Sequence, residues 1–205
     1  AEGVIFENWE MGAFDDNLPY WFGLDFGFVA DPDSCVRVAI DESRKLIYIK
    51  EEFYEHRQTI DQLSHRINRL DKGSIVADSA EQRLINDLTT KCRRSVMPVK
   101  KGAGSIMQGI KLMQNYGIVV TPDSTNIIKE LNNYCWNGKS KEAPIDFYNH
   151  AIDAIRYVVF TYANRANPKQ PKYENQNTRF IKGDTTGFNA ATWNNTRKGA
   201  SDSFF

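Results

Sequence analysis

The chain has 205 residues, of which 26 are basic and 26 acidic, so its formal net charge at pH 7 is zero. This length predicts one domain, or one domain with an appendage, and it is long enough to bury a sizeable core. The neutral balance excludes bulk attraction to a polyanion, so any nucleic-acid affinity has to come from local patches. Three cysteines far apart, with no C-x-x-C pair, argue against a disulfide framework and against a zinc site. We find no apolar run of about 18 residues and no signal-peptide pattern, so no membrane partner is expected.

Residues 20–28 are an apolar, aromatic run with a single acid, Asp25, near the middle. Pro19 precedes the run and the turn residues 31–33 follow it, which predicts a buried strand. Because an unpaired buried charge costs several kcal/mol, an aspartate here needs a partner, a metal ion or an altered pKa. A structural carboxylate that accepts backbone hydrogen bonds is the alternative interpretation.

Two further strands are expected after this one. Residues 34–40 alternate apolar and polar, residues 41–44 supply a turn, and residues 45–54 resume an apolar pattern. The three segments together predict an antiparallel meander. A helical period then begins after Thr59, which is suited to cap a helix.

A second acid ends the next strand. Residues 74–78 read Ser-Ile-Val-Ala-Asp, and after residues 79–81 a helix is carried by Leu84, Ile85 and Leu88. Asp78 is therefore expected at the carboxyl end of a strand, which is where ligands bind in open α/β sheets. Capping of the following helix by Asp78 or Ser79 is the alternative interpretation.

The segment Lys100-Lys101-Gly102-Ala103-Gly104-Ser105 leads from a short strand into a helix. Free backbone amides and the helix dipole at such a position suit a phosphate contact. The segment is not a Walker A loop, because Ile110 occupies the position of the required lysine. A solvated loop followed by a helix cap explains the pattern equally well.

The last predicted helix carries His150 and Asp153, which are three residues apart and so lie on one face. Asp146 and Phe147 are expected on the same face, one turn earlier. A surface pair is the usual explanation for His-x-x-Asp, but the surrounding positions are strongly apolar, which favours partial burial.

The composition divides the chain into three parts. Residues 1–19 are expected to be an irregular lead-in, residues 20–165 a folded domain, and residues 166–205 a polar, partly disordered tail. The middle part predicts an α/β fold in which the three-strand meander is followed by βα units and the mixed sheet is flanked by helices. Because the chain enters in mid-sequence at Ala1, we expect it to be part of a larger protein.

Asp25, Asp78 and Asp153 can converge if the first predicted strand lies beside the one that ends at Asp78. Converging carboxylates repel one another unless divalent cations lie between them. Hard oxygen ligands select Mg²⁺ or Mn²⁺ over zinc. Two such ions about 4 Å apart can activate a water molecule and stabilise the leaving oxygen in phosphodiester hydrolysis.

Three stretches carry a resemblance to a known family: Gly23-Leu24-Asp25-Phe26-Gly27-Phe28, Ala77-Asp78-Ser79-Ala80-Glu81, and His150-Ala151-Ile152-Asp153-Ala154-Ile155-Arg156-Tyr157. They resemble the three acidic motifs of the C-terminal nuclease domain of the terminase large subunit of tailed bacteriophages. The resemblance implies a ribonuclease H-like fold and metal-dependent endonuclease cleavage of concatemeric viral DNA. It also implies that Asp25, Asp78 and Asp153 bind two Mg²⁺ or Mn²⁺ ions, with His150 catalytic beside them.

Further implications of the resemblance concern partners. Double-stranded DNA would be the substrate, and Lys100, Lys101, Lys139 and Lys141 are the best candidates for phosphate contacts. An ATPase domain of the same full-length protein, a small terminase subunit and the portal protein would be partners, in the cytoplasm of the infected bacterial host. This chain has no Walker A or Walker B segment, so no ATP hydrolysis is expected from it.

Two alternatives remain open from the sequence. One is another ribonuclease H-like nuclease, such as a resolvase or an integrase, which shares the acidic trio. The other is a docking module of a packaging motor, without catalysis, in which the acids are structural. Metal-dependent cleavage separates the docking module from both kinds of enzyme.

Overall fold

A computed structural model describes residues 3–28, 30–92, 94–138 and 143–163. The predicted tail and the two candidate lysines Lys139 and Lys141 lie outside these ranges. The elements follow one another as β1 (Trp9–Met11), β2 (Tyr20–Asp25), β3 (Pro32–Asp41), β4 (Leu46–His56), α1 (Ile60–Arg69), β5 (Ile75–Ala77), α2 (Gln82–Cys92), β6 (Val96–Pro98), α3 (Ser105–Met113), β7 (Gly117–Val120), α4 (Thr125–Asn133) and α5 (His150–Tyr162).

The strands form one mixed sheet in the order β1-β7-β4-β3-β2-β5-β6. The antiparallel meander is confirmed, because β3 pairs antiparallel with both β2 and β4. The remaining pairs, β2 with β5, β5 with β6, β4 with β7 and β1 with β7, are parallel. The strand that carries Asp25 therefore lies directly beside the strand that precedes Asp78, as predicted.

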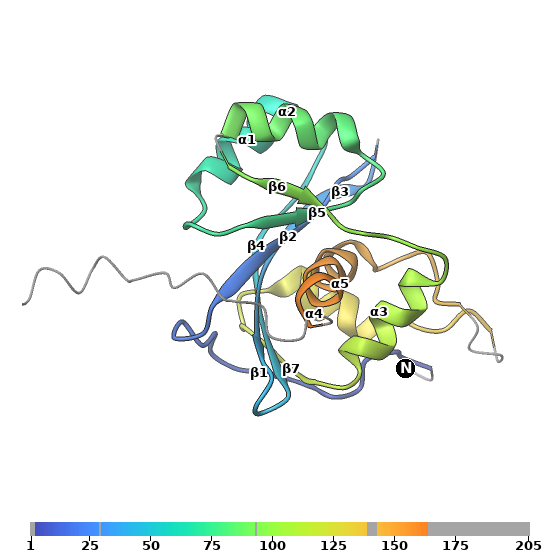
Figure 1. The fold of residues 1–205 in the computed structure, drawn as a ribbon. Helices are drawn as coiled ribbons and strands as arrows, with labels where there is room; N and C mark the ends of the chain where they lie inside the picture. The colour runs from blue at the N-terminus through green and yellow to red at the C-terminus, as the bar shows by residue number, and fades with distance from the viewer. Residues whose placement is uncertain (1–2, 29, 93, 139–142, 164–205) are drawn as a thin grey trace, which may run out of the picture. The chain divides into compact units, whose positions relative to one another are not determined.

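Helices cover both faces of the sheet (Figure 1). On one face α3, α4 and α5 pack over the larger apolar core, which includes the fully buried Val36, Val38 and Val158. On the other face α1 and α2 pack over a second core that includes Phe22 and Leu24. Because successive strand residues point to opposite faces, β2 supplies Trp21 to the first core and Phe22 to the second. The predicted α/β class, a mixed sheet flanked by helices, is confirmed.

Local sequence accounts for the first helix. The Thr59 side chain accepts a hydrogen bond from the Gln62 backbone, and the Gln62 side chain accepts one from the Thr59 backbone. This reciprocal pair is a capping box, which satisfies two amides that the first turn leaves free. Apolar residues at helical spacing then bury Leu63 and Ile67 against the second core.

Two segments differ from the expectation. Residues 1–19 were expected to be irregular, but Trp9–Met11 form β1, which pairs with β7 at the sheet edge. The pairing partner of β1 lies more than 100 residues away, so periodicity within the segment could not reveal it. Asp146 and Phe147 were expected on the last helix, but α5 begins at His150. Tyr148 has φ +59°, a left-handed conformation that α-helix excludes, and this explains the later start.

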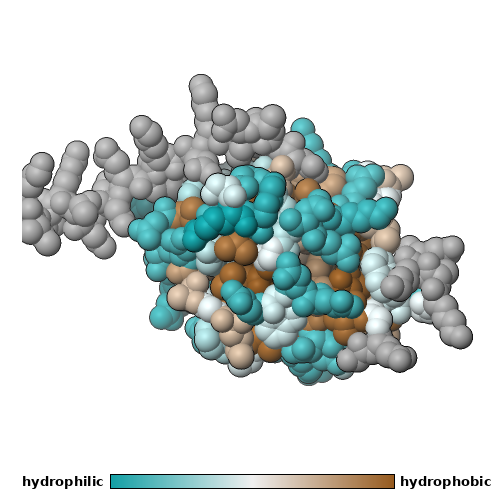
Figure 2. Space-filling view, turned by 90° about the horizontal axis from the view of Figure 1, so that it is seen from below, coloured by the Kyte–Doolittle hydropathy of each residue, from teal (hydrophilic) through white to brown (hydrophobic). Residues whose placement is uncertain are grey.

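The face of the domain seen from below carries both apolar and hydrophilic side chains (Figure 2). In Figure 2, which views it from below, apolar side chains are visible in the middle of this face between hydrophilic ones. An open groove of about 310 Å³ lies between residues 4–8 of the N-terminal segment and residues of the α3–β7 region and Trp136. No helix in the described ranges is both long enough and apolar enough to span a membrane.

Candidate active site

Two of the three predicted acids lie at the carboxyl ends of neighbouring parallel strands. Asp25 is the last residue of β2, and Asp78 directly follows β5. The register pairs Leu24 with Ala77, and the Asp78 backbone N–H donates to the Leu24 carbonyl at 3.3 Å. The two carboxylates are therefore brought to the same edge of the sheet by strand pairing alone.

The hydroxyl of Tyr157, on α5, lies between these two acids. Its oxygen is 2.9 Å from Asp25 Oδ1 and 3.3 Å from Asp78 Oδ2. Lys101 reaches the same point, since its Nζ is 2.5 Å from Asp78 Oδ1 and 3.4 Å from the Tyr157 oxygen. Asp25, Asp78, Lys101 and Tyr157 thus form one hydrogen-bonded group, drawn from two strand ends, a loop and a helix.

His150, the first residue of α5, approaches Asp25 from the opposite side. Its Nδ1 is 3.2 Å from Asp25 Oδ2, and its Nε2 is 3.7 Å from Asp31 Oδ1. The hydrogen bond to Asp25 raises the pKa of His150, although burial opposes the shift. The imidazole is therefore held where it can exchange a proton next to the Asp25 carboxylate.

Asp153, one turn further along α5, is paired with Arg156. Its Oδ1 accepts from Arg156 Nη2 at 2.9 Å and from Nε at 3.1 Å. The Arg156 side chain is only 3% exposed, so this ion pair is shielded from water. Of the three predicted acids, Asp153 is the one that is hydrogen-bonded to Arg156, whereas the other two lie within hydrogen-bonding distance of the Tyr157 hydroxyl; its negative charge still raises the pKa of Asp25.

The acids shift one another's pKa values. Burial raises the pKa of Asp25, and the negative charge of Asp153 raises it further. Burial likewise raises the pKa of Asp153, against the opposing effect of Arg156, and the charge of Asp78 adds to the rise. Burial also acts on Asp78, but the Ala80 backbone N–H and the Lys101 ammonium outweigh it, so the pKa of Asp78 is lowered. The charge of one carboxylate thus affects the pKa of the next, from Asp78 to Asp153 and from Asp153 to Asp25. We call Asp25, Asp78 and Asp153 the acidic group.

Sequence reasoning gave Tyr157 no role, although a signal for it was present. Tyr157 is four residues after Asp153 and seven after His150, which places all three on one helix face. Burial, and then the charge of Asp25, raises the pKa of Tyr157, so its hydroxyl remains protonated and can donate. The donor lies between two acids that would otherwise repel each other.

Of the four candidate phosphate-binding lysines, the structure describes two. Lys100 is exposed on the loop after β6, and Gly104, the residue before α3, has a left-handed conformation with φ +74° and provides no side-chain cap. The first turn of α3 therefore has no side-chain cap, and its backbone N–H groups could donate to a phosphate; the phosphate contact stays a prediction. Lys101 instead points into the acidic group, where it neutralises Asp78.

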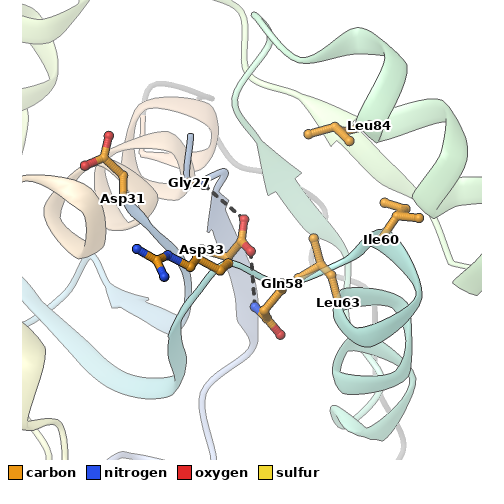
Figure 3. A pocket seen from close by; sticks show the side chains of 8 residues that line it. Gly27, Asp31, Asp33, Gln58, Ile60, Leu63 and Leu84 are labelled. Atoms are coloured by element: carbon orange, nitrogen blue, oxygen red, sulfur yellow. Dashed lines mark hydrogen bonds between the residues drawn. The ribbon is translucent and has the colours of Figure 1, made fainter. Parts of the chain in front are cut away.

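A groove of about 280 Å³ is lined by residues from the segment that follows Asp25 and by residues of α1 and α2 (Figure 3). Its polar side includes Asp31 and Asp33, and Ile60, Leu63 and Leu84 line its apolar side. Asp33 accepts from the Gly27 backbone and from Gln58, which fixes the loop that follows Asp25. Asp31 belongs both to this groove and to the surroundings of His150, so the groove adjoins the acidic group without containing its three predicted acids.

The donor chemistry of the acidic group suits a hard divalent cation, because three carboxylates from separate elements share one field. In the described part of the chain, however, no three His, Cys, Asp or Glu side chains are already gathered closely enough to hold a metal ion. Lys101 and Arg156 hold Asp78 and Asp153 instead. Cation binding would require at least the flexible, 31% exposed Lys101 side chain to release Asp78.

The model of the Terminase RNAseH like domain family matches residues 25–160, which is more than half of the 205-residue chain. The chain belongs to this family. The matched range begins at Asp25 and includes Asp78, His150 and Asp153. The predicted resemblance to the C-terminal nuclease domain of the terminase large subunit is confirmed.

Relatives of this terminase domain are longer proteins. The large terminase subunit of Bacillus phage SPP1 is 32% identical over 165 residues, which are 76% of this chain and 38% of that protein. The PBSX phage terminase large subunit of Bacillus subtilis strain 168 is 29% identical over 147 residues, or 68% of this chain and 34% of that protein. The chain therefore spans little more than a third of the length of these curated relatives.

A solved structure agrees with the family assignment. The crystal structure of the large terminase nuclease domain from bacteriophage SPP1, with bound Mn, is 31% identical and has a TM-score of 0.65. The similarity covers 75% of this chain and 96% of that domain. The terminase domain described here thus has the ribonuclease H-like fold of a nuclease domain.

Proposed function

We propose that this terminase domain is a divalent-metal-dependent DNA endonuclease that cleaves concatemeric viral DNA during genome packaging. The reaction would be phosphodiester hydrolysis assisted by two Mg²⁺ or Mn²⁺ ions. The observation that carries the proposal is the meeting of Asp25 and Asp78 on the two sides of the Tyr157 hydroxyl, with Asp153 coupled to both by charge. The Mn bound to the related SPP1 nuclease domain supports the choice of metal.

Each acid has a defined task in this proposal. Asp25, Asp78 and Asp153 are the residues that would hold the cations, because they are the carboxylates that share the field at the edge of β2 and β5. Bound cations would supply an activated water and charge stabilisation for the leaving oxygen. Tyr157 would keep Asp25 and Asp78 oriented, since its hydroxyl is within hydrogen-bonding distance of both.

His150 would act as a proton carrier and not as an indispensable ligand. Its Nδ1 contacts Asp25, and Asp25 raises its pKa, so the imidazolium form persists to higher pH than in an isolated histidine. A group with this placement can accept a proton from an attacking water or deliver one to a leaving oxygen. Both transfers occur beside the carboxylate where the reaction would take place.

Substrate contacts would come from the loop between β6 and α3. Lys100 and the free amides at the start of α3 would bind DNA phosphates, and Lys139 and Lys141 are further candidates. Lys101 would exchange from Asp78 to a phosphate of the bound DNA, because both offer it a negatively charged oxygen. Phosphate contacts position DNA without reading bases, so the domain itself should accept many sequences.

We also propose partners for the full-length protein. An ATPase domain of the same polypeptide, a small terminase subunit and the portal protein would supply movement and specificity, in the cytoplasm of the infected bacterium. The support is that the curated relatives are terminase large subunits, and that the matched region is 38% of one and 34% of the other.

The direct test is incubation of the purified chain with supercoiled plasmid and Mn²⁺, with an EDTA control. Cleavage should require the metal, and Asp25→Asn, Asp78→Asn and Asp153→Asn should each abolish it while circular dichroism shows a folded protein. Asp61→Asn is the matched control, because Asp61 is an exposed acid that pairs with Lys91 on the surface. It should cleave as the wild type does.

A folded chain without metal-dependent cleavage would favour the docking module instead. Cleavage that survives all three substitutions would also refute the proposed site, because the reaction would then use other groups. The membership of the terminase family favours a packaging nuclease over a resolvase or an integrase.

A further inference from the structure

Glu130 of α4 is a buried carboxylate to which sequence reasoning assigned no role. It is 1% exposed, and α4 and α5 lie against each other on the same face of the sheet (Figure 1). Its Oε2 accepts from the Ile152 backbone N–H at 3.0 Å, and the Ala151 N–H is a further donor. Its Oε1 accepts from the Tyr54 hydroxyl of β4 at 2.9 Å. Both oxygens of this buried carboxylate therefore accept a hydrogen bond.

These hydrogen bonds replace a missing cap. The residue before α5, Asn149, makes no side-chain hydrogen bond to the first turn. The amides of Ala151 and Ile152 are among those that a helix leaves unpaired at its start. Glu130 accepts from Ile152 across a helix–helix contact, and its negative charge also complements the positive end of the α5 dipole.

The turn that Glu130 holds is the turn that carries the catalytic groups. His150 and Asp153 flank Ala151 and Ile152, so a shift of these two amides moves both side chains relative to Asp25. Tyr54 adds a second constraint on the position of His150. The centroids of the two rings are 6.5 Å apart in an edge-to-face arrangement, and the Tyr54 hydroxyl donates to Glu130. β4, α4 and α5 are thus joined at the Glu130 carboxylate, next to the turn that carries His150.

We infer that Glu130 is a positioning residue, which sets the place of His150 and Asp153 by capping α5 from α4. This inference rests on the proposed nuclease function for its kinetic consequence, but not for its structural one. A loss of the cap should lower the rate of the chemical step more than the affinity for DNA, because the phosphate contacts lie on another loop.

The chain contains a matched control for this cap. Glu51 of β4 caps α4 in the same manner, accepting from the Asn126 N–H at 2.9 Å and from the Ile127 N–H at 3.2 Å. α4 likewise has no side-chain cap from its own preceding residue. Glu51→Ala therefore removes these two backbone bonds, and a third from the Asn126 side chain at 2.7 Å, at a helix start that carries no catalytic group.

The experiment compares Glu130→Ala, Glu130→Gln and Glu51→Ala in thermal unfolding and in Mn²⁺-dependent cleavage kinetics. Glu130→Ala should lower kcat about 10- to 100-fold, as loss of a group that orients a ligand typically does, with KM for DNA nearly unchanged. Glu130→Gln should recover most of kcat, because an amide oxygen can still accept from Ile152. Glu51→Ala should lose similar thermal stability and keep kcat within about twofold, since its cap holds the start of α4 and not the turn of α5 that carries His150 and Asp153.

A readout independent of cleavage is the NMR signal of the His150 imidazole, assigned by its loss in His150→Ala. Glu130→Ala should move this signal and Glu51→Ala should leave it in place. A Glu130→Ala protein with the kcat and the His150 signal of Glu51→Ala would overturn the inference. If Glu130→Ala does not fold, Tyr54→Phe removes one bond to Glu130 and should still move the signal; an unmoved signal and an unchanged kcat would then refute the inference.

The two proposals fail in different ways. A wild-type chain that does not cleave refutes the proposed function, whereas the His150 signal still tests the role of Glu130. A wild-type chain that cleaves, with kcat unaffected by Glu130→Ala, refutes the positioning role alone.

Discussion

Gly23 is the point at which α5 comes closest to β2, and Gly23→Ala should disrupt the site without touching any of its side chains. A Cβ at this position would lie 2.0 Å from the Ala154 carbonyl oxygen and 3.1 Å from Val158 Cγ2. The first atom is backbone and cannot rotate away. Reaching an ordinary contact of about 3.4 Å therefore requires α5 and β2 to separate by about 1.4 Å.

This separation has two expected consequences. Overpacking of a core costs about 1–3 kcal/mol, and the upper end applies here because the clash is with backbone. For a domain of this size, about 3 kcal/mol corresponds to a melting temperature lower by about 6–12 °C. Asp153 adjoins Ala154 and Asp25 is two residues from Gly23, so a displacement of this size should also reduce cleavage by about 100-fold.

The assays are thermal unfolding by circular dichroism and plasmid cleavage with Mn²⁺. Gly102→Ala is the stability control, because a Cβ there has no neighbour within 4 Å and its φ is not positive. It should leave the melting temperature unchanged or raise it slightly. A Gly23→Ala protein that melts and cleaves like the wild type would show that α5 is not held at this distance, and our account of the site would fail.

Three further predictions concern pH, proton transfer and salt. Because burial and then Asp153 raise the pKa of Asp25 above its ordinary 3.8, its contribution to the free energy of unfolding in EDTA is present below about pH 4 and is lost as pH rises through the folded-state value. Denaturant titrations from pH 4 to 8 should show this loss as a fall in the free energy of unfolding, and the fall should be smaller in Asp25→Asn. An equal dependence of the free energy of unfolding on pH in both proteins would contradict the assignment. His150→Ala should slow cleavage and leave Mn²⁺ binding measurable by calorimetry, whereas an unaltered rate from pH 6 to 9 would make its role structural. DNA binding should weaken steeply with salt and be equal for unrelated duplexes of one length, and a strong preference for one duplex would show that the chain reads bases.

The strand-borne acids could be predicted from the sequence because each is marked locally. Asp25 interrupts an apolar run and Asp78 ends one, and both features are visible within about ten residues. Their meeting also followed from the predicted order of strands. Tyr157 is marked only by its helical spacing from His150 and Asp153, and Glu130 carries no mark of this kind, because an acid on an amphipathic helix is ordinary until its neighbours in space are known.

Lys101 is a residue whose main contact the local sequence did not predict. Its sequence context, a basic loop before a helix, predicts a phosphate contact, and Lys100 in that loop is indeed exposed. The structure places the Lys101 ammonium on Asp78, because the Val99 N–H donates to the Ala77 carbonyl and so holds the start of this loop beside the end of β5. A lysine next to an acid 23 residues away is a consequence of sheet pairing, which local pattern does not encode.

The sequence by itself determined the α/β class, the meander, the order of the main elements and the three acids, because periodicity and turn residues act over short distances. Only the tertiary structure decided which groups each acid meets. Pairing of β2 with β5 brings Asp25 and Asp78 together, the close approach of α5 over Gly23 adds His150, Asp153 and Tyr157, and Glu130 fixes the start of that helix. These contacts join residues as far as 132 positions apart, and such contacts depend on how whole elements pack and not on the residues beside them.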